Sequence, residues 1–334
     1  MNSYHHQYID RITGRACTEP LLWDKSIQLL YTEVREHAPI LFRALVSSHA
    51  SRVLGFVNFD LPIPYRTRQF IHSCGVDFTE CLDAPADLDT ARKLFERKIR
   101  YWECRPMVDD VSAVVSPADA RVLMGSFDSI SSLFIKQKFF DYDELLGQDK
   151  QEWLSTFRNG AFMMFRLTPD KYHYNHTPVA GEVKDFYEIS GGYHSCNPGA
   201  VVSLVTAYSK NKRVVTIIDT DVPRGSGIGL VAMIEVVALM VGEVEQAYSD
   251  NRYDNPRPVI PGMFLEKGVP KSLFRPGSST VVLLFQESRL EFADDLVRNM
   301  HRTDVQSRYS AGFGKPLVET DVKVRSLVGT AARA

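Results

Sequence analysis

The spacing of apolar residues changes character about one third of the way along this chain of 334 residues. Between residues 21 and 54, apolar side chains recur every three or four positions, the period of a helix with one buried face, and Pro39 interrupts the pattern. The ranges 68–81 and 88–103 also have helical character. We therefore predict a helical N-terminal region over residues 1–106, in which a polar, extended lead-in occupies the first positions.

From Met107 onward, short apolar runs are separated by turn residues, which is typical of strands. The predicted strands are 111–122, 161–167, 201–207, 214–218, 229–240, 280–285 and 317–324. Residues 141–157 are predicted to be helical, and 130–140 fits either structure. The pattern predicts an α+β protein in which the helical N-terminal region precedes a β-rich, sandwich-like catalytic domain over residues 107–334.

The N-terminal helices allow two interpretations. Their apolar faces could pack into a core, or they could rest on a bilayer surface, since Arg35, Arg43 and Arg52 lie among their polar positions. No run of about 18 apolar residues is present, so no spanning helix is predicted. Residues 1–15 lack the apolar core of a signal peptide. We expect a cytoplasmic protein in peripheral contact with the inner face of the cell membrane.

Composition argues against several classes of partner and of structural site. A formal net charge of −2 gives no strong attraction to nucleic acid, so no nucleic-acid partner is expected. The five cysteines are odd in number and include no C-x-x-C pair, which argues against a disulfide framework and a structural zinc site. This cysteine usage suits a reducing cytoplasm.

The most informative stretch is a serine turn that leads into a buried strand. Pro276 and Gly277 break the chain, Ser278 and Ser279 follow, and an apolar run reaches Phe285. A serine hydroxyl held against the preceding carbonyl can attack its own backbone, and a strained turn is a suitable place for that reaction. By themselves, these residues are also those of an ordinary β-turn.

Three other residues could provide acid–base chemistry. His173 and His176 stand three apart in a segment rich in turn residues, and imidazole titrates near neutral pH. Asp119 could orient one imidazole, which would then activate a serine, as in an Asp-His-Ser relay. Alternatively, Asp119 and the histidines stabilise turns. A serine hydrolase is disfavoured because no G-x-S-x-G elbow occurs, and we expect no metal because the ligand spacing is wrong.

Three motifs, in this order, resemble those of the pyruvoyl-dependent phosphatidylserine decarboxylases over roughly residues 90–330. They are Pro117-Ala118-Asp119-Ala120, Tyr172-His173-Tyr174-Asn175-His176-Thr177-Pro178 and Gly277-Ser278-Ser279-Thr280. The family has Gly at the position of Ala120, Arg at the position of Tyr174, and one serine fewer in the bacterial form of the third motif. The missing arginine matters, because arginine is a natural partner for a phosphate or carboxylate.

The resemblance implies a proenzyme that cuts itself between Ser278 and Ser279, with Ser278 as the alternative processed serine. Ser279 would become a covalent pyruvoyl group, and neither pyridoxal phosphate nor a metal would be needed. Asp119 would orient His176, His176 would activate Ser279, and His173 would deliver a proton during turnover. The cleaved two-chain units are expected to form a homo-oligomer.

The resemblance leaves the substrate open. The first hypothesis is decarboxylation of phosphatidylserine to phosphatidylethanolamine through a Schiff base with the pyruvoyl group. The second is the same chemistry on a free L-amino acid, such as an aromatic one. The third is a family member without activity that binds lipid.

Overall fold

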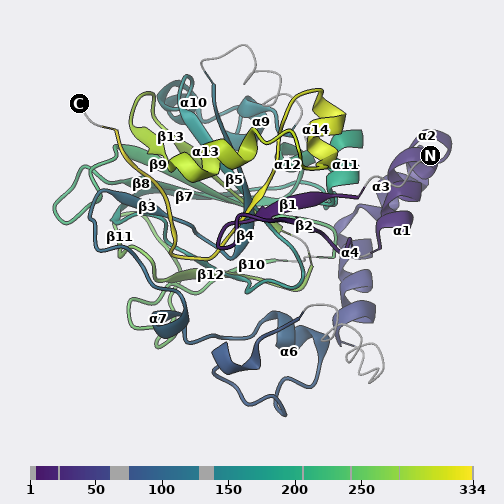
Figure 1. Ribbon diagram of the computed structural model, residues 1–334, viewed down its shortest axis with the longest axis horizontal. Coiled ribbons are helices and arrows are strands. Elements are labelled where there is room, and N and C mark those ends of the chain that lie inside the picture. Colours follow the sequence, from purple (N-terminus) through teal and green to yellow (C-terminus); the bar gives the residue numbers. More distant parts are fainter. Residues whose placement is uncertain are drawn as a thin grey trace.

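The computed structural model describes residues 5–21, 23–60, 75–127, 139–204, 207–240, 243–277 and 279–332. Helices of the N-terminal region stand beside a body built on one large twisted sheet (Figure 1). The predicted α+β class is confirmed. The expected helix at 68–81 lies partly, and the ambiguous range 130–140 mostly, outside the described residues.

The predicted helices between residues 21 and 54 are present as several short segments, and Pro39 begins a new one. The predicted helix over 88–103 is two helices, because residues 96–100 leave the helical path and Ile99 forms a bridge with Cys81. The helices of this region are α1 (Asp24–Leu29), η1 (Leu30–Val34), α2 (Arg35–His37), α3 (Pro39–Leu45), α4 (Ser48–Gly55), η2 (Phe56–Asp60), η3 (Phe78–Glu80), α6 (Ala91–Phe95) and α7 (Tyr101–Cys104).

The large sheet has the strand order β11-β7-β8-β9-β13-β5-β4-β15-β1-β2, and its pairs are antiparallel except β1 with β15. Its strands are β1 (Gln7–Asp10), β2 (Ala16–Thr18), β4 (Ala120–Ser126), β5 (Ala161–Leu167), β7 (Gly181–Ile189), β8 (Arg213–Asp219), β9 (Leu230–Val237), β11 (Phe264–Leu265), β13 (Ser279–Phe285) and β15 (Thr320–Val322). The polar lead-in of the chain thus adds two strands, β1 and β2, to this sheet.

Two three-stranded sheets accompany the large one, in the orders β10-β12-β6 and β14-β16-β3. Their strands are β3 (Ala113–Val115), β6 (Tyr174–His176), β10 (Val244–Gln246), β12 (Pro270–Phe274), β14 (Leu290–Phe292) and β16 (Leu327–Ala331). The remaining helices are α9 (Tyr142–Leu146), α10 (Gln151–Thr156), α11 (Pro198–Ser203), α12 (Ala207–Lys210), α13 (Asp294–Met300) and α14 (Arg308–Phe313).

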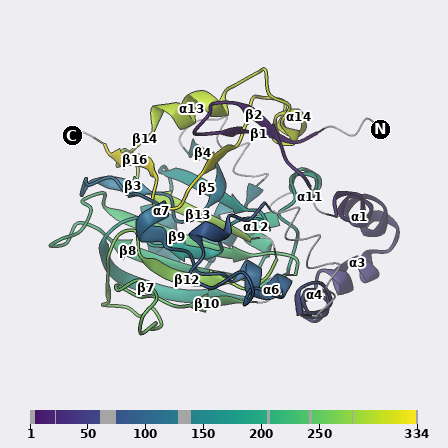
Figure 2. The same cartoon turned by 60° about the horizontal axis from the view of Figure 1, so that its bottom comes forward.

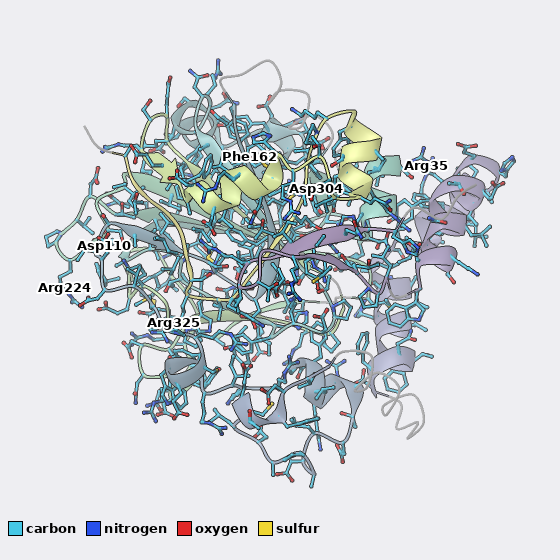
Figure 3. All side chains as sticks on the ribbon, in the orientation of Figure 1. Arg35, Asp110, Phe162, Arg224, Asp304 and Arg325 are labelled. Carbon is cyan, nitrogen blue, oxygen red and sulfur yellow. The ribbon has the colours of Figure 1, made fainter. Side chains whose placement is uncertain are left out.

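The core lies around β9, β13 and β5, which are buried at nearly every position. Strands covered on both faces carry continuous apolar sequences, so β5 and β13 were predicted to within one residue, whereas β9, predicted over 229–240, ends at Val237. Phe162 of β5 lies in the body of the molecule, whereas Asp110 and Arg224 lie at its periphery (Figure 3).

The predicted strand at 201–207 is wrong, because that range begins within α11. The Asn197 side chain accepts a hydrogen bond from the backbone N–H of Gly199 at 2.8 Å, and Pro198 occupies the first helical turn. This N-terminal cap and a well-placed proline outweigh the strand preference of Val201 and Val202.

The N-terminal helices are attached beside the ends of the central strands, where β5 and β9 end and β13 begins. The Tyr31 hydroxyl accepts from the Ser195 N–H at 2.6 Å, and the Ser51 hydroxyl accepts from the Met240 N–H at 2.8 Å. Arg35 donates to the carbonyl of Ser203 at 2.7 Å. Figure 2 shows α1, α3 and α4 together on one side of the sheet. The helices therefore border the region that contains the serine turn.

Candidate active site

Ser279 is the first residue of β13, between β5 and β9, and pairs with Leu167 and Val237. Its side chain is fully buried, and its hydroxyl has no hydrogen-bond partner among the described residues. An unpaired buried hydroxyl is costly, so its retention points to a chemical use. Gly277 has φ +147°, a backbone conformation that L side chains rarely adopt. Ser278 lies outside the described residues.

A cavity of about 50 Å³ lies at this end of the three central strands. Leu167 and Thr168 line it at the end of β5, and Leu239 and Met240 line it just beyond β9. Cys196 also lines it and lies 3.2 Å from the Thr280 hydroxyl, counted from Sγ to Oγ1. Because Leu167 is the strand partner of Ser279, this cavity adjoins the serine turn.

His176 lies on β6, and both of its ring nitrogens are occupied. Nδ1 is 3.0 Å from the carbonyl oxygen of Gly268, and Nε2 is 2.9 Å from the Tyr172 hydroxyl. A carbonyl can only accept, so Nδ1 carries the proton and Nε2 accepts from Tyr172. Burial lowers the pKa of His176 to about 3, so the ring is neutral at physiological pH.

His173 is also fully buried, but neither ring nitrogen has a hydrogen-bond partner within the described part of the chain. Its ring stacks on Phe95 of α6 with centroids 3.4 Å apart and planes 23° apart. Burial, together with the nearby Arg97 charge, lowers the pKa of His173 to about 3. A neutral imidazole with unoccupied nitrogens can take up a proton or exchange one with a bound molecule.

Asp119 is buried and tied to Arg105 rather than to a histidine. Its two carboxylate oxygens accept from Arg105 at 3.0 and 2.7 Å, and one also accepts from the Val324 N–H at 2.8 Å. Burial acts to raise the pKa of Asp119, but the Arg105 charge and hydrogen bonds outweigh it and hold the pKa below its usual range. Asp119 is therefore a carboxylate at neutral pH.

The segments that carry Asp119 and His176 are joined by a backbone hydrogen bond. The His176 N–H donates to the carbonyl of Pro117, two residues before Asp119, at 2.7 Å. No hydrogen bond joins Asp119, His176 and Ser279 to one another among the described residues. Gly268 performs the task that the sequence assigned to Asp119, because its carbonyl fixes the tautomer of His176. The roles of the four residues therefore remain predictions.

Comparison with known protein families agrees with the resemblance found in the sequence. Residues 91–311 match the family described as phosphatidylserine decarboxylase. The chain belongs to the phosphatidylserine decarboxylase family. This confirms the resemblance drawn from the three motifs, and it confirms the predicted enzyme class, since phosphatidylserine decarboxylases are carboxy-lyases.

Curated members of the phosphatidylserine decarboxylase family match this chain over nearly its whole length. The phosphatidylserine decarboxylase proenzyme of Chlamydia pneumoniae is 29% identical over 88% of this chain and 91% of the relative. That of Chlamydia muridarum is 28% identical over 94% of this chain and 99% of the relative. A shorter match, to phosphatidylserine decarboxylase proenzyme 2 of Oryza sativa subsp. japonica, is 32% identical over 68% of this chain and 34% of the relative.

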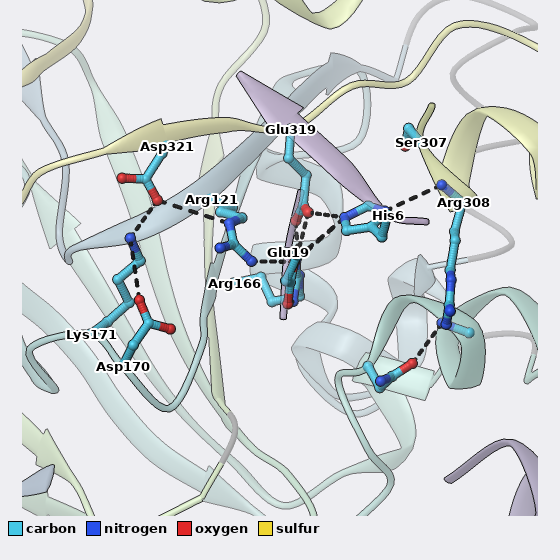
Figure 4. Close-up of polar contacts among 12 residues, drawn as sticks. His6, Glu19, Arg121, Arg166, Asp170, Lys171, Ser307, Arg308, Glu319 and Asp321 are labelled. Carbon is cyan, nitrogen blue, oxygen red and sulfur yellow. Dashed lines mark hydrogen bonds and ion pairs between the residues drawn. The ribbon is translucent and has the colours of Figure 1, made fainter. Parts of the chain in front are cut away.

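A buried cluster of charges, of which Glu19 and Arg166 line the cavity, lies partly outside the range matched by the family (Figure 4). His6, Glu19 and Glu319 are close enough together to hold a metal ion. However, Arg166 donates to Glu19 at 2.7 Å and to Glu319 at 2.5 Å, so both carboxylates are already paired. Arg121 also pairs with Glu19. The cluster ties the residue after β2 and the residue before β15 to Arg166 of β5, which is the chain neighbour of Leu167.

Several residues that shape the site were missed from the sequence. Arg105 contacts Asp119 from 14 residues away, and Gly268 and Phe95 contact His176 and His173 from more distant parts of the chain. Tyr172 could have been found, because it lies four residues before His176 in the same motif. Thr168 is a buried hydroxyl in the cavity wall and follows the strand partner of Ser279.

Proposed function

We propose that this protein is a self-processing, pyruvoyl-dependent phosphatidylserine decarboxylase that produces phosphatidylethanolamine and carbon dioxide. The observation that carries the proposal is Ser279, a fully buried serine with an unpaired hydroxyl, placed after Gly277 at the start of the central strand. Membership of the family supports the same chemistry.

In maturation, the Ser279 Oγ attacks the carbonyl carbon of Ser278, and the amide becomes an ester. Loss of the Ser279 α-proton expels the Ser278 carboxylate, which becomes the end of the first chain. Water then replaces the nitrogen of the resulting dehydroalanine, and ammonia leaves. These steps need the hydroxyl to be deprotonated by a neighbouring base and the turn to hold the oxygen against the carbonyl.

His176 is the proposed base for this attack. Its Nδ1 proton is held by Gly268, so the lone pair is on Nε2, the nitrogen that must accept the serine proton. Asp119 is proposed to support the segment that carries His176, through the contact of Pro117 with the His176 N–H. His173 is proposed for proton transfer in turnover, because its nitrogens are unoccupied.

The residues at the turn fit a pyruvoyl group. Within the described residues, the Ser279 hydroxyl has no hydrogen bond to break when its oxygen leaves with the Ser278 carboxylate, and a cavity of about 50 Å³ lies beside Leu167. The group, when formed, would supply an electron sink for the loss of carbon dioxide. The chain itself contributes burial, which excludes water, and neutral imidazoles for proton transfer.

Exposed apolar side chains on the N-terminal helices favour a lipid substrate over a free amino acid. Ile40, Val53 and Phe56 are 83, 62 and 55% exposed, and Trp23, Leu29, Leu41 and Val57 are also exposed. Within the described residues no single helix is long and apolar enough to cross a membrane. The bent pair Pro39–Leu45 and Ser48–Asp60 has the length and the apolar composition only when its two parts are taken together. We propose that these helices contact the membrane surface, which would bring the site to its substrate.

The intact mass of the denatured protein tests the proposal. We expect two chains, one ending at Ser278 and one beginning with a pyruvoyl group at position 279, and a single uncut chain for Ser279→Ala. The mature protein should release carbon dioxide from phosphatidylserine vesicles and not from free serine or aromatic amino acids. A wild-type chain that stays uncut after long incubation, or a Ser279→Ala chain that splits, would contradict the proposal.

A further inference from the structure

The entrance to the serine turn is fixed by Arg275, the residue before Pro276. Its guanidinium donates to Glu96 at 2.9 Å and also forms an ion pair with Glu245 of β10. Its backbone N–H donates to the Glu243 carbonyl at 3.2 Å. Residue 275 is therefore held through both its side chain and its backbone.

The exit from the turn is fixed as firmly, because Ser279 is paired with strands on both sides. Three residues, 276 to 278, connect these two anchored points. Pro276 has a fixed φ, and Gly277 adopts a positive φ. If residue 275 moves, residues 276 to 278 must therefore change conformation. These residues include the carbonyl that Ser279 is proposed to attack.

Glu96 is itself held by a neighbour on the other side. Arg92 donates to Glu96 at 2.8 Å and to Asp60 of η2 at 2.7 Å. Glu96 follows directly after α6, and the preceding residue, Phe95, stacks on His173. This short helix thus contacts a candidate catalytic histidine through Phe95 and the serine turn through Glu96.

The same arginines line a cavity of about 220 Å³ beside Pro276, together with Arg52 and Glu243. Two of its three arginines are already neutralised, since Asp60, Glu96 and Glu245 pair with Arg92 and Arg275. The pairs therefore act as a tether rather than as a free site for an anion.

We infer that Arg275, through its ion pair with Glu96, is a positioning residue for self-cleavage. The inference rests on the proposed function and assigns one step of it, the attack of the Ser279 hydroxyl on the preceding carbonyl. That attack requires the two atoms to be held about 3–3.5 Å apart in the correct orientation. The tether fixes residue 275, at the entrance to the turn, so that this geometry can be reached, and it has no part in decarboxylation once the bond is cut.

The test compares the rates at which newly purified chains split, measured on denaturing gels and by intact mass. We expect Arg275→Gln and Glu96→Gln to slow cleavage about tenfold, and Arg275→Lys, which keeps the charge, to restore most of the rate. Carbon dioxide release per cleaved molecule should equal that of the wild type in all three. Arg11→Gln is the matched control, because Arg11 forms a similar pair with Asp295 of α13, at 2.7 Å, on the opposite side of the molecule from α6 (Figures 1 and 2).

Salt gives a second measurement that a simple loss of packing would not change. Because the Arg275 side chain is 36% exposed, the pair is open to screening, and wild-type cleavage should slow as salt is raised to about 1 M. Cleavage of Arg275→Gln should not change with salt, and cleavage of Glu96→Gln, which keeps the pair of Arg275 with Glu245, should change less than that of the wild type. If Arg275→Gln does not fold, Glu96→Gln decides the question.

Two outcomes would overturn the inference while leaving the proposed function intact. One is a wild-type cleavage rate in Arg275→Gln or Glu96→Gln. The other is equal slowing in Arg275→Lys and Arg275→Gln, which would assign the effect to side-chain packing instead of charge. A wild-type chain that never splits would instead refute the proposed function, and this inference with it.

Discussion

The imidazole of His176 donates from Nδ1 to the carbonyl oxygen of Gly268 across 3.0 Å. This bond selects the tautomer in which Nε2 carries the lone pair, with the Tyr172 hydroxyl as its present partner. A backbone carbonyl can fix the tautomer of an imidazole as a carboxylate can, although it gives less stabilisation to a positive charge. The arrangement suits a base that must accept a proton briefly.

Replacing His176 should therefore stop maturation. We expect His176→Gln, which keeps much of the volume but has no basic nitrogen, to slow self-cleavage by about 100-fold or more. Tyr172→Phe is the matched control, because it removes the hydroxyl partner and leaves the base. It should cleave within about fivefold of the wild type. Time courses of chain splitting measure both, and normal cleavage in His176→Gln would remove the residue from this role.

The role proposed for His173 makes a different prediction. His173→Gln should spare chain splitting more than turnover, because a proton is needed from this position only after maturation. The measurement is carbon dioxide release per cleaved molecule, with the cleaved fraction determined by intact mass. Equal release from the wild type and His173→Gln would exclude the role.

The two buried histidines should also make stability depend on pH. Their pKa values are about 3 in the folded protein, below the ordinary value near 6.5 of an unfolded chain. Between pH 3 and 6.5 the unfolded chain binds more protons than the folded protein does. The free energy of unfolding is therefore not reduced by these histidines above about pH 6.5, and it falls as the pH is lowered toward 3. Each contributes a slope of up to about 1.4 kcal/mol per pH unit.

Urea unfolding at several pH values between 7.5 and 4.5 measures this slope. The Ser279→Ala background keeps the chain uncut and the unfolding reaction simple. His173→Phe, which preserves a ring against Phe95, should have a shallower slope than its parent. Because the carboxylates are common to both proteins, their contribution cancels in the comparison, and identical slopes would show that His173 is not buried as a neutral ring.

Removing Arg105 should destabilise the protein because it leaves the Asp119 carboxylate buried without its charge partner. We expect Arg105→Gln to lower the free energy of unfolding by about 3–5 kcal/mol. The double variant Arg105→Gln with Asp119→Asn should recover part of that loss, since the uncompensated charge is then absent. Chemical unfolding on the uncut background measures Arg105→Gln, Asp119→Asn and the double variant, and strictly additive effects would contradict this account.

The sequence predicts the centre of the fold better than its edges. β5, β9 and β13 are buried on both faces and carry uninterrupted apolar runs, so each was recognised. β7 was missed, because four of its nine residues are charged and it is only partly buried. The error at α11 has a local cause, since the cap at Asn197 decides the structure of the residues after it.

For the site, the motifs located the residues that carry functional groups but not the contacts between them. Ser279 could be placed at the start of a strand because Pro276 and Gly277 mark the turn. The partners Arg105, Gly268 and Phe95 arrive through tertiary structure, and no local pattern identifies a backbone carbonyl as the orienting group of a histidine. The expected link between Asp119 and His176 was implied by the family resemblance, and here the carboxylate is paired with Arg105.

The proposed membrane contact gives the last prediction. Val53 and Phe56 are three residues apart, spanning the end of α4 and the start of η2, and both are exposed. The double variant Val53→Ser with Phe56→Ser should bind phosphatidylserine vesicles at least about tenfold more weakly, because burying each large apolar side chain contributes about 1.5–3 kcal/mol to binding.

Val111→Ser with Ile260→Ser is the matched control, since these side chains are 67 and 58% exposed and lie outside the N-terminal helices. Co-sedimentation measures binding, and chain splitting should be unchanged in both variants. Equal binding by the two double variants would show that the N-terminal helices do not form the contact, and the lipid would then have to reach the cavity beside Leu167 from another face.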